Sequence, residues 1–127
     1  MDMLLHAVNW FEIPVSDFAR AKKFYSEIFA YDMPEMEMGP VRMGILPHDR
    51  QGGGIGGAIC AGEGYTPSDR GPKIYLNGGS DLTTVLDRVE AAGGKVLLQK
   101  TEISPESGHF ALFRDSEGNH LGLHSMA

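Results

Sequence analysis

Polar and aromatic side chains that could take part in binding or catalysis alternate with apolar residues in three short runs of the chain. Trp10 and Glu12 alternate with apolar neighbours near the N-terminus, and the other runs lie at residues 75–77 and 120–124. Because successive side chains of a β-strand point to opposite faces, the polar members of each run would share one face of a sheet. We therefore expect a ligand-binding surface made of Trp10, Glu12, Tyr75, Asn77, His120 and His124.

The chemistry of these side chains suits a small polar molecule with an unsaturated or ring portion. The indole of Trp10 and the phenol of Tyr75 offer flat surfaces, whereas the carboxylate and the imidazoles offer hydrogen bonds. Glu12 is the candidate catalytic residue, because a carboxylate can move a proton, and His120 is its acid–base partner in one interpretation. The residues by themselves are compatible with two functions: binding of a ligand without a reaction, and catalysis.

An internal repeat indicates which elements position these residues. Ser16-Asp17 recurs 64 residues later as Ser80-Asp81, and the apolar positions that follow each pair keep the same spacing. A long unit present only twice indicates a duplicated module rather than a solenoid, which needs at least three units. Two related halves packed together commonly enclose a cavity, so the expected site lies between them.

The pattern within each half predicts a βαβββ module, and the α+β class overall. The first module is expected over residues 1–64, with strands at 6–15, 36–38, 41–45 and 55–61 and a helix from an N-cap at Ser16 to about Ala30. The second is expected over residues 65–127, with strands at 73–77, 95–101, 109–114 and 120–124 and a helix at 81–92. The eight strands should form a curved, half-barrel-like sheet with the helices outside, burying Phe18, Phe24, Tyr25, Ile28, Leu82, Leu86 and Val89.

Composition excludes several classes of partner. The net charge of −6 opposes nucleic-acid binding, and no apolar run approaches the roughly 18 residues that span a bilayer. The single cysteine, Cys60, excludes an internal disulfide, and with the absence of a secretory leader it predicts a cytoplasmic protein.

Several short motifs resemble those of the vicinal oxygen chelate superfamily, which includes glyoxalase I, extradiol dioxygenases and bleomycin-resistance proteins. The matching segments are Phe11-Glu12-Ile13-Pro14-Val15, Ala91-Ala92-Gly93-Gly94, Glu117-Gly118-Asn119 and Gly122-Leu123. The chain looks most similar to the small single-chain branch related to lactoylglutathione lyase. The resemblance implies a homodimer, an expectation that the exposed sheet edges of a short, strand-rich chain also favour.

Catalytic members of that superfamily hold a divalent metal with four ligands, two from each module. Carried over to this chain, those positions fall on Trp10, on the stretch Gly57–Cys60, on Lys73 or Tyr75, and on Gly122, so the usual tetrad is absent and we expect no cofactor. The predicted function is therefore binding of a small polar metabolite between the modules. The alternative is a metal-dependent lyase, isomerase or dioxygenase that uses a displaced site of Glu12, His120 and His124.

Overall fold

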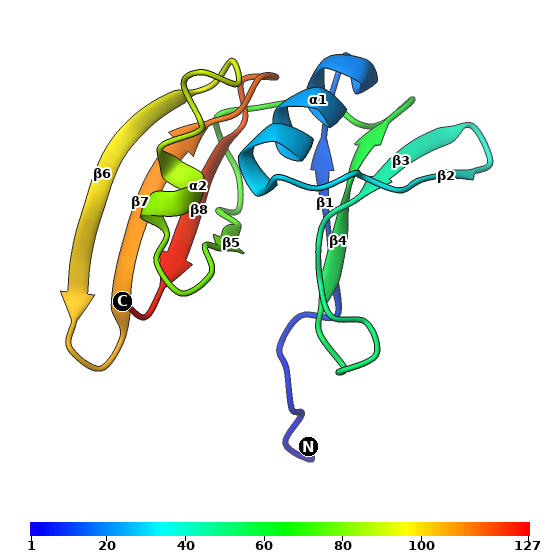
Figure 1. Cartoon of the computed structure of the whole chain (residues 1–127). Coiled ribbons are helices and arrows are strands. Elements are labelled where there is room, and N and C mark those ends of the chain that lie inside the picture. Colours follow the sequence, from blue (N-terminus) through cyan, green and yellow to red (C-terminus); the bar gives the residue numbers. More distant parts are fainter.

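The computed structural model describes residues 1–127 and contains two βαβββ modules (Figure 1). The first consists of β1 (Trp10–Pro14), α1 (Phe18–Phe29), β2 (Glu35–Met38), β3 (Val41–Ile45) and β4 (Gly56–Ala61). The second consists of β5 (Tyr75–Asn77), α2 (Thr83–Leu86), β6 (Lys95–Ser104), β7 (Gly108–Arg114) and β8 (His120–Ser125). The α+β class and the eight strands expected from the sequence are confirmed.

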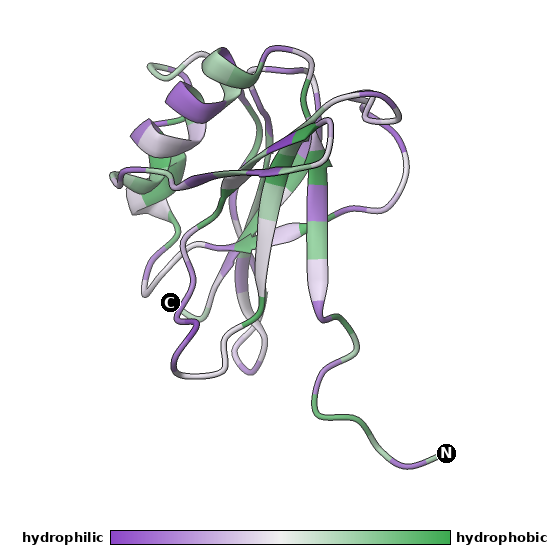
Figure 2. Cartoon of the chain, turned by 90° about the vertical axis from the view of Figure 1, so that its right-hand side faces the viewer, coloured by the Kyte–Doolittle hydropathy of each residue, from purple (hydrophilic) through white to green (hydrophobic).

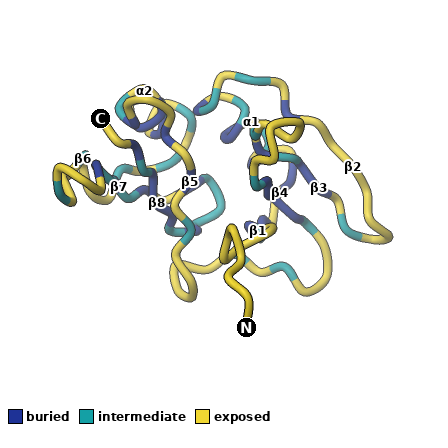
Figure 3. The backbone as a smooth tube through the Cα atoms, turned by 90° about the horizontal axis from the view of Figure 1, so that it is seen from below, coloured by how far each residue is buried: buried dark blue, intermediate teal, exposed yellow.

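The strands form two separate four-stranded sheets rather than one continuous sheet. Their orders are β1-β4-β3-β2 and β5-β8-β7-β6, and only the β1–β4 and β5–β8 pairs are parallel. The edge strands β1 and β5 face the other module and pair with no strand across the gap (Figures 1 and 3). Residues 62–74 connect the sheets, and the expected module boundary between residues 64 and 65 falls in this segment.

The first strand begins later than the expected residue 6. Its pairing with β4 starts at Trp10, opposite Gly56, and the residues before it project away from the modules (Figure 2). This N-terminal segment carries exposed apolar side chains at Met1, Met3, Leu4 and Leu5. Without a partner strand, alternating apolar residues do not by themselves form a β-strand.

Helix α1 has the apolar stripe predicted for it, but its N-cap is Asp17 and not Ser16. The Asp17 carboxylate accepts a hydrogen bond from the Arg20 amide at 3.0 Å, as an N-cap side chain does. The stripe of Phe18, Ala21, Phe24, Tyr25 and Ile28 is buried, in agreement with its i, i+3, i+4 spacing.

The second helix is much shorter than the expected 81–92. Only Thr83–Leu86 is α-helical, and a series of turns carries the chain on to Gly94. One cause is visible in the sequence: three consecutive β-branched residues, Thr83, Thr84 and Val85, lower its helix propensity. Leu82, Leu86 and Val89 are nevertheless buried as expected.

One hydrophobic cluster of 19 buried residues includes side chains from both modules. Phe24 of α1 stacks on Phe113 of β7 with ring centroids 6.2 Å apart, and the Tyr25 hydroxyl donates to the Asp115 carboxylate at 2.7 Å. The modules therefore share a core where α1 lies against the second sheet. No helix of the chain has the length and apolar character needed to cross a bilayer.

Candidate ligand-binding site

A cavity of about 980 Å³ lies between the two modules. Residues from β1 and the start of β4 form one wall, and β5 with the turn leading to α2 forms the other. The volume is within the range of roughly 300–1,000 Å³ that is usual for pockets holding small organic ligands. The edge strands β1 and β5 thus border this cavity from its two sides.

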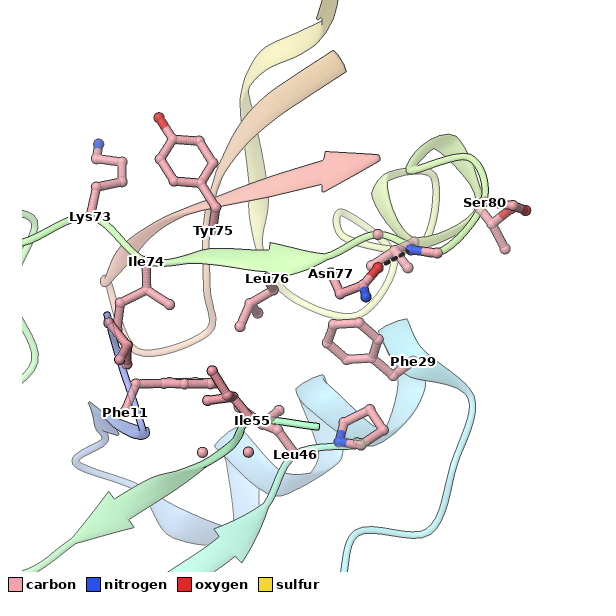
Figure 4. Close-up of a pocket in the computed structure, with 18 of the residues that line it drawn as sticks. Phe11, Phe29, Leu46, Ile55, Lys73, Ile74, Tyr75, Leu76, Asn77 and Ser80 are labelled. Atoms are coloured by element: carbon pink, nitrogen blue, oxygen red, sulfur yellow. Dashed lines mark hydrogen bonds between the residues drawn. The ribbon is translucent and has the colours of Figure 1, made fainter. Parts of the chain in front are cut away.

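The interior of this cavity is apolar. Side chains from both modules converge on it, as Figure 4 shows, and they are Phe11, Phe29, Leu46, Ile55, Ile74 and Leu76. Leu76 belongs to the shared hydrophobic core, and Phe11 packs against that core. The cavity therefore lies next to the core, on the faces of β1 and β5 that point towards the other module.

Gly57 gives this wall its shape. It pairs with Phe11 across β1 and β4, and a Cβ atom at this position would collide with the Phe11 ring. Glycine is therefore required for the aromatic ring to lie against β4.

Polar groups lie at the edge of the cavity. The Asn77 side-chain oxygen accepts from the Gly79 amide at 2.9 Å, which leaves the Asn77 amino group free to donate (Figure 4). Asp81 accepts from the Thr83 amide and from Lys100, both at 3.0 Å. These bonds lower the pKa of Asp81 to about 2, the backbone bond from Thr83 contributing most, so its carboxylate is ionised and already paired.

A second, smaller pocket of about 260 Å³ brings Glu12 and His120 together. The two oxygens of Glu12 are held separately, one by the Tyr65 hydroxyl at 2.7 Å and the other by the Trp10 indole N–H at 3.3 Å. The bond to Glu12 raises the pKa of Tyr65 to about 12, so the phenol keeps its proton at neutral pH and acts as a donor. Arg70 also lines this pocket.

The six residues expected to share one cavity are divided among different places. Asn77 and Tyr75 border the large cavity, although the Tyr75 ring projects from the other side of β5 (Figure 4), and Glu12 and His120 line the small pocket. Trp10 and His124 line neither, and the His124 Nε2 donates to the Ser107 carbonyl at 2.6 Å. Strand alternation places these residues on one face of each sheet, but the larger hollow forms on the opposite face, where the modules meet.

The residues at the superfamily's metal positions do not fit a metal ion. Trp10 has no ligand atom, the buried Cys60 has a pKa raised to about 12, chiefly by burial, and the Tyr75 ring covers Gly122 so closely that any side chain there would collide with it. No group of three His, Cys, Asp or Glu side chains in the chain is arranged to hold a metal. Glu12, His120 and His124, the residues of the expected displaced site, do not form such a group, and the His124 Nε2 is hydrogen-bonded to the Ser107 carbonyl.

Several residues of the two pockets were not expected from the sequence. Phe11, Ile74 and Leu76 lie on apolar faces, and a residue facing an apolar cavity has the same sequence pattern as one packed in a core. Tyr65 did have a usable signal, since it is the lone aromatic residue of the polar segment 62–72.

The chain is similar in sequence to a family model and to a known protein. Residues 8–43 match the family model described as "Bleomycin resistance protein-like N-terminal". A "Glyoxylase-like domain-containing protein" of Didymella fabae is 31% identical over 121 residues, which make up 92% of this chain and 92% of that protein.

Solved structures share the fold at low sequence identity. An antibiotic binding protein from Streptomyces sp. CB03234, TnmS3, has a TM-score of 0.65 and 22% identity, with 99% of this chain and 100% of that chain covered. A glyoxalase/bleomycin resistance protein/dioxygenase family enzyme from Burkholderia phytofirmans has a TM-score of 0.67 and 15% identity, with 94% and 98% covered. A mutant of maize glyoxalase I has a TM-score of 0.68 and 20% identity; the alignment covers 92% of this chain but only 45% of that longer chain.

The βαβββ duplication, the family model and the Didymella fabae relative agree, and the extent of that relative's identity shows the family. This chain belongs to the vicinal oxygen chelate superfamily, in its glyoxalase and bleomycin-resistance group.

Proposed function

We propose that this protein binds a small organic molecule in the cavity between its modules and does so without a metal. The observation that carries the proposal is the cavity of about 980 Å³ into which six apolar side chains converge, two of them aromatic. Such a lining favours a ligand with a ring or unsaturated portion, and the polar rim at Asn77 and Ser80 favours a ligand that also bears hydrogen-bonding groups. The similarity in fold to an antibiotic binding protein supports a binding role.

A neutral fluorescent probe tests this proposal. N-phenyl-1-naphthylamine is a flat apolar molecule whose emission rises in apolar surroundings, so titration should give a saturable increase with one site per chain. Ile55 lines the cavity, and Ile55→Trp should fill part of it and weaken probe binding by about tenfold or more. Ile103 is 51% exposed on β6 and lines neither pocket, so Ile103→Trp is the matched control and should bind as the wild type does.

Equal binding by the wild type and Ile55→Trp would refute the cavity as the binding site, provided that both proteins unfold cooperatively. Native mass spectrometry of the protein as purified gives a second measurement. A co-purifying molecule that is lost from Ile55→Trp and retained by Ile103→Trp would support the proposal and supply the ligand's mass.

A second candidate function is metal-independent acid–base catalysis at the small pocket. It is favoured by the meeting of Glu12 and His120 in one pocket, where Tyr65 and Trp10 hold the Glu12 carboxylate in place. Once a ligand is identified, this function requires that Glu12→Gln abolish its turnover while changing its affinity only a few-fold. Recovery of unchanged ligand after prolonged incubation with the wild type would leave binding as the function.

A further inference from the structure

We infer that the cavity between the modules selects an amphipathic anion, a molecule with an apolar ring-containing body and a carboxylate, phosphate or sulfonate group. The inference rests on the proposed binding function and adds the charge of the ligand to it. The observation that carries it is that two basic residues of the lining, Lys73 and Arg88, have no acidic partner.

The charges of the lining are unbalanced in favour of positive. Its charged residues are Lys73, Asp81 and Arg88. Asp81 is paired with Lys100 at 3.0 Å, whereas neither Lys73 nor Arg88 has a carboxylate within ion-pair distance. In a chain of net charge −6, where six of the 11 Lys and Arg residues are ion-paired, this cavity is an unexpected place for two uncompensated cations.

Arg88 is the better placed of the two. One of its guanidinium nitrogens donates to the Ile28 carbonyl at 3.1 Å, which anchors the half-buried side chain beside Phe29 at the end of α1. A guanidinium has five N–H donors, so this single bond leaves others for an anionic group, and its planar fork matches a carboxylate or phosphate.

Lys73 lies at the opposite end of the cavity. It precedes β5 and is exposed, and Figure 4 shows its side chain far from Phe29 and on the same side of the strand as Tyr75, pointing away from Ile74 and Leu76. Its flexible four-carbon stem lets the ammonium group approach a ligand at the rim. The apolar side chains would hold the body of the ligand. Arg88 is placed to pair with its negative group, and Lys73 can approach that group only from the rim.

Physical reasons connect this arrangement to the ligand's charge. Placing a charged group in an apolar cavity is costly unless an opposite charge compensates it, and an existing unpaired cation supplies that compensation for an anion. The same cations repel a cationic ligand and give nothing to a neutral one. The cavity would therefore discriminate by charge among molecules of the same shape.

Two fluorescent probes with the same ring system test the inference. 8-Anilinonaphthalene-1-sulfonate carries a sulfonate, and N-phenyl-1-naphthylamine lacks it. We expect Arg88→Gln to weaken binding of the sulfonate by about 3- to 10-fold and Lys73→Gln to weaken it less. Each variant should lower the affinity for the sulfonate more than the affinity for the neutral probe. Arg88→Lys should keep most of the sulfonate affinity. Lys95 is an unpaired cation outside both pockets, so Lys95→Gln is the control and should change neither affinity.

The outcomes separate the two proposals. If both probes bind in the cavity, as judged by loss in Ile55→Trp, and Lys73→Gln and Arg88→Gln leave the ratio of their affinities unchanged, anion selection is overturned and the binding function stands. If neither probe binds, or Ile55→Trp has no effect, the proposed binding function fails and the inference fails with it. Lys73→Gln keeps the test valid should Arg88→Gln unfold, because Lys73 is exposed and makes no ion pair.

Discussion

The side chain of Glu117 links the second module to the start of α1, and Glu117→Gln should weaken that link. One carboxylate oxygen accepts from the backbone amides of Ser16 at 3.0 Å and Asp17 at 2.7 Å. The other accepts from the Arg20 Nε at 2.7 Å and from the Ser116 hydroxyl at 3.0 Å. The Glu117 side chain has no exposed surface, and it lies at the helix end where a negative charge is favourable.

The size of the effect follows from the pKa of this carboxylate. Burial opposes its ionisation, but the hydrogen bonds from Arg20, Asp17, Ser116 and Ser16 together outweigh burial and lower the pKa from 4.5 to about 2. Through linkage, a difference of this size between the folded and unfolded chain corresponds to about 3 kcal/mol of stability at neutral pH. Because Arg20 is 54% exposed and therefore screened by solvent, we expect about 2 kcal/mol.

Urea unfolding of the wild type and of Glu117→Gln, at pH 7 and at a series of lower pH values, measures this contribution. Since the folded pKa is below the unfolded one, the stabilisation is complete above about pH 4.5 and is lost as the pH falls towards 2. The wild type should therefore be more stable than the variant by about 2 kcal/mol at pH 7, and this difference should shrink below pH 4.5.

Glu35→Gln is the matched control. Glu35 also accepts hydrogen bonds from two basic residues, Lys22 and Arg42, and these bonds lower its pKa, but its side chain is 35% exposed. Its substitution should cost clearly less than that of Glu117. Equal losses in the two variants, or a loss in Glu117→Gln that does not depend on pH, would refute this reasoning.

The remaining predictions concern the shared core, metal binding and assembly. Tyr25→Phe removes a buried hydrogen bond to Asp115 and should lower the free energy of unfolding by about 1–3 kcal/mol; a melting temperature equal to that of the wild type would contradict this. After incubation with nickel, zinc, iron or manganese and desalting, elemental analysis should find less than one metal per chain, because Trp10 and Gly122 occupy ligand positions; one tightly held equivalent would contradict it. Light scattering should give the mass of a homodimer, since the edge strand β2 exposes Met36 and Met38 and needs covering; a monomer mass at micromolar concentration would disprove it.

Local patterns in the sequence predicted much of the fold correctly. The repeated Ser-Asp pairs predicted two βαβββ modules, and the spacing of Phe24, Tyr25 and Ile28 predicted the buried stripe of α1. Alternation also placed Trp10 and Glu12 opposite the buried Ile13. These features depend on the regular spacing of side chains along a helix or strand. That spacing can be recognised from residues that are close together in the sequence.

The length of the second helix and the position of the cavity were not predictable in the same way. A stripe of Leu82, Leu86 and Val89 indicates which side chains are buried, but it does not distinguish a regular helix from a series of turns that buries the same residues. Similarly, the alternation of apolar and polar residues around Phe11 and around Leu76 indicates that these side chains point inward. It cannot show whether they are fully packed or border a cavity.

The sequence by itself determined the order of the strands and helices and the faces of the strands. Only the tertiary structure decided that Glu12 meets Tyr65 and His120, that His124 binds Ser107, and that the large cavity opens on the core-facing side. The physical reason is distance along the chain. Glu12 and Tyr65 are 53 residues apart, and Asp17 and Glu117 are 100 apart, so their contacts depend on how two modules pack and not on any local pattern.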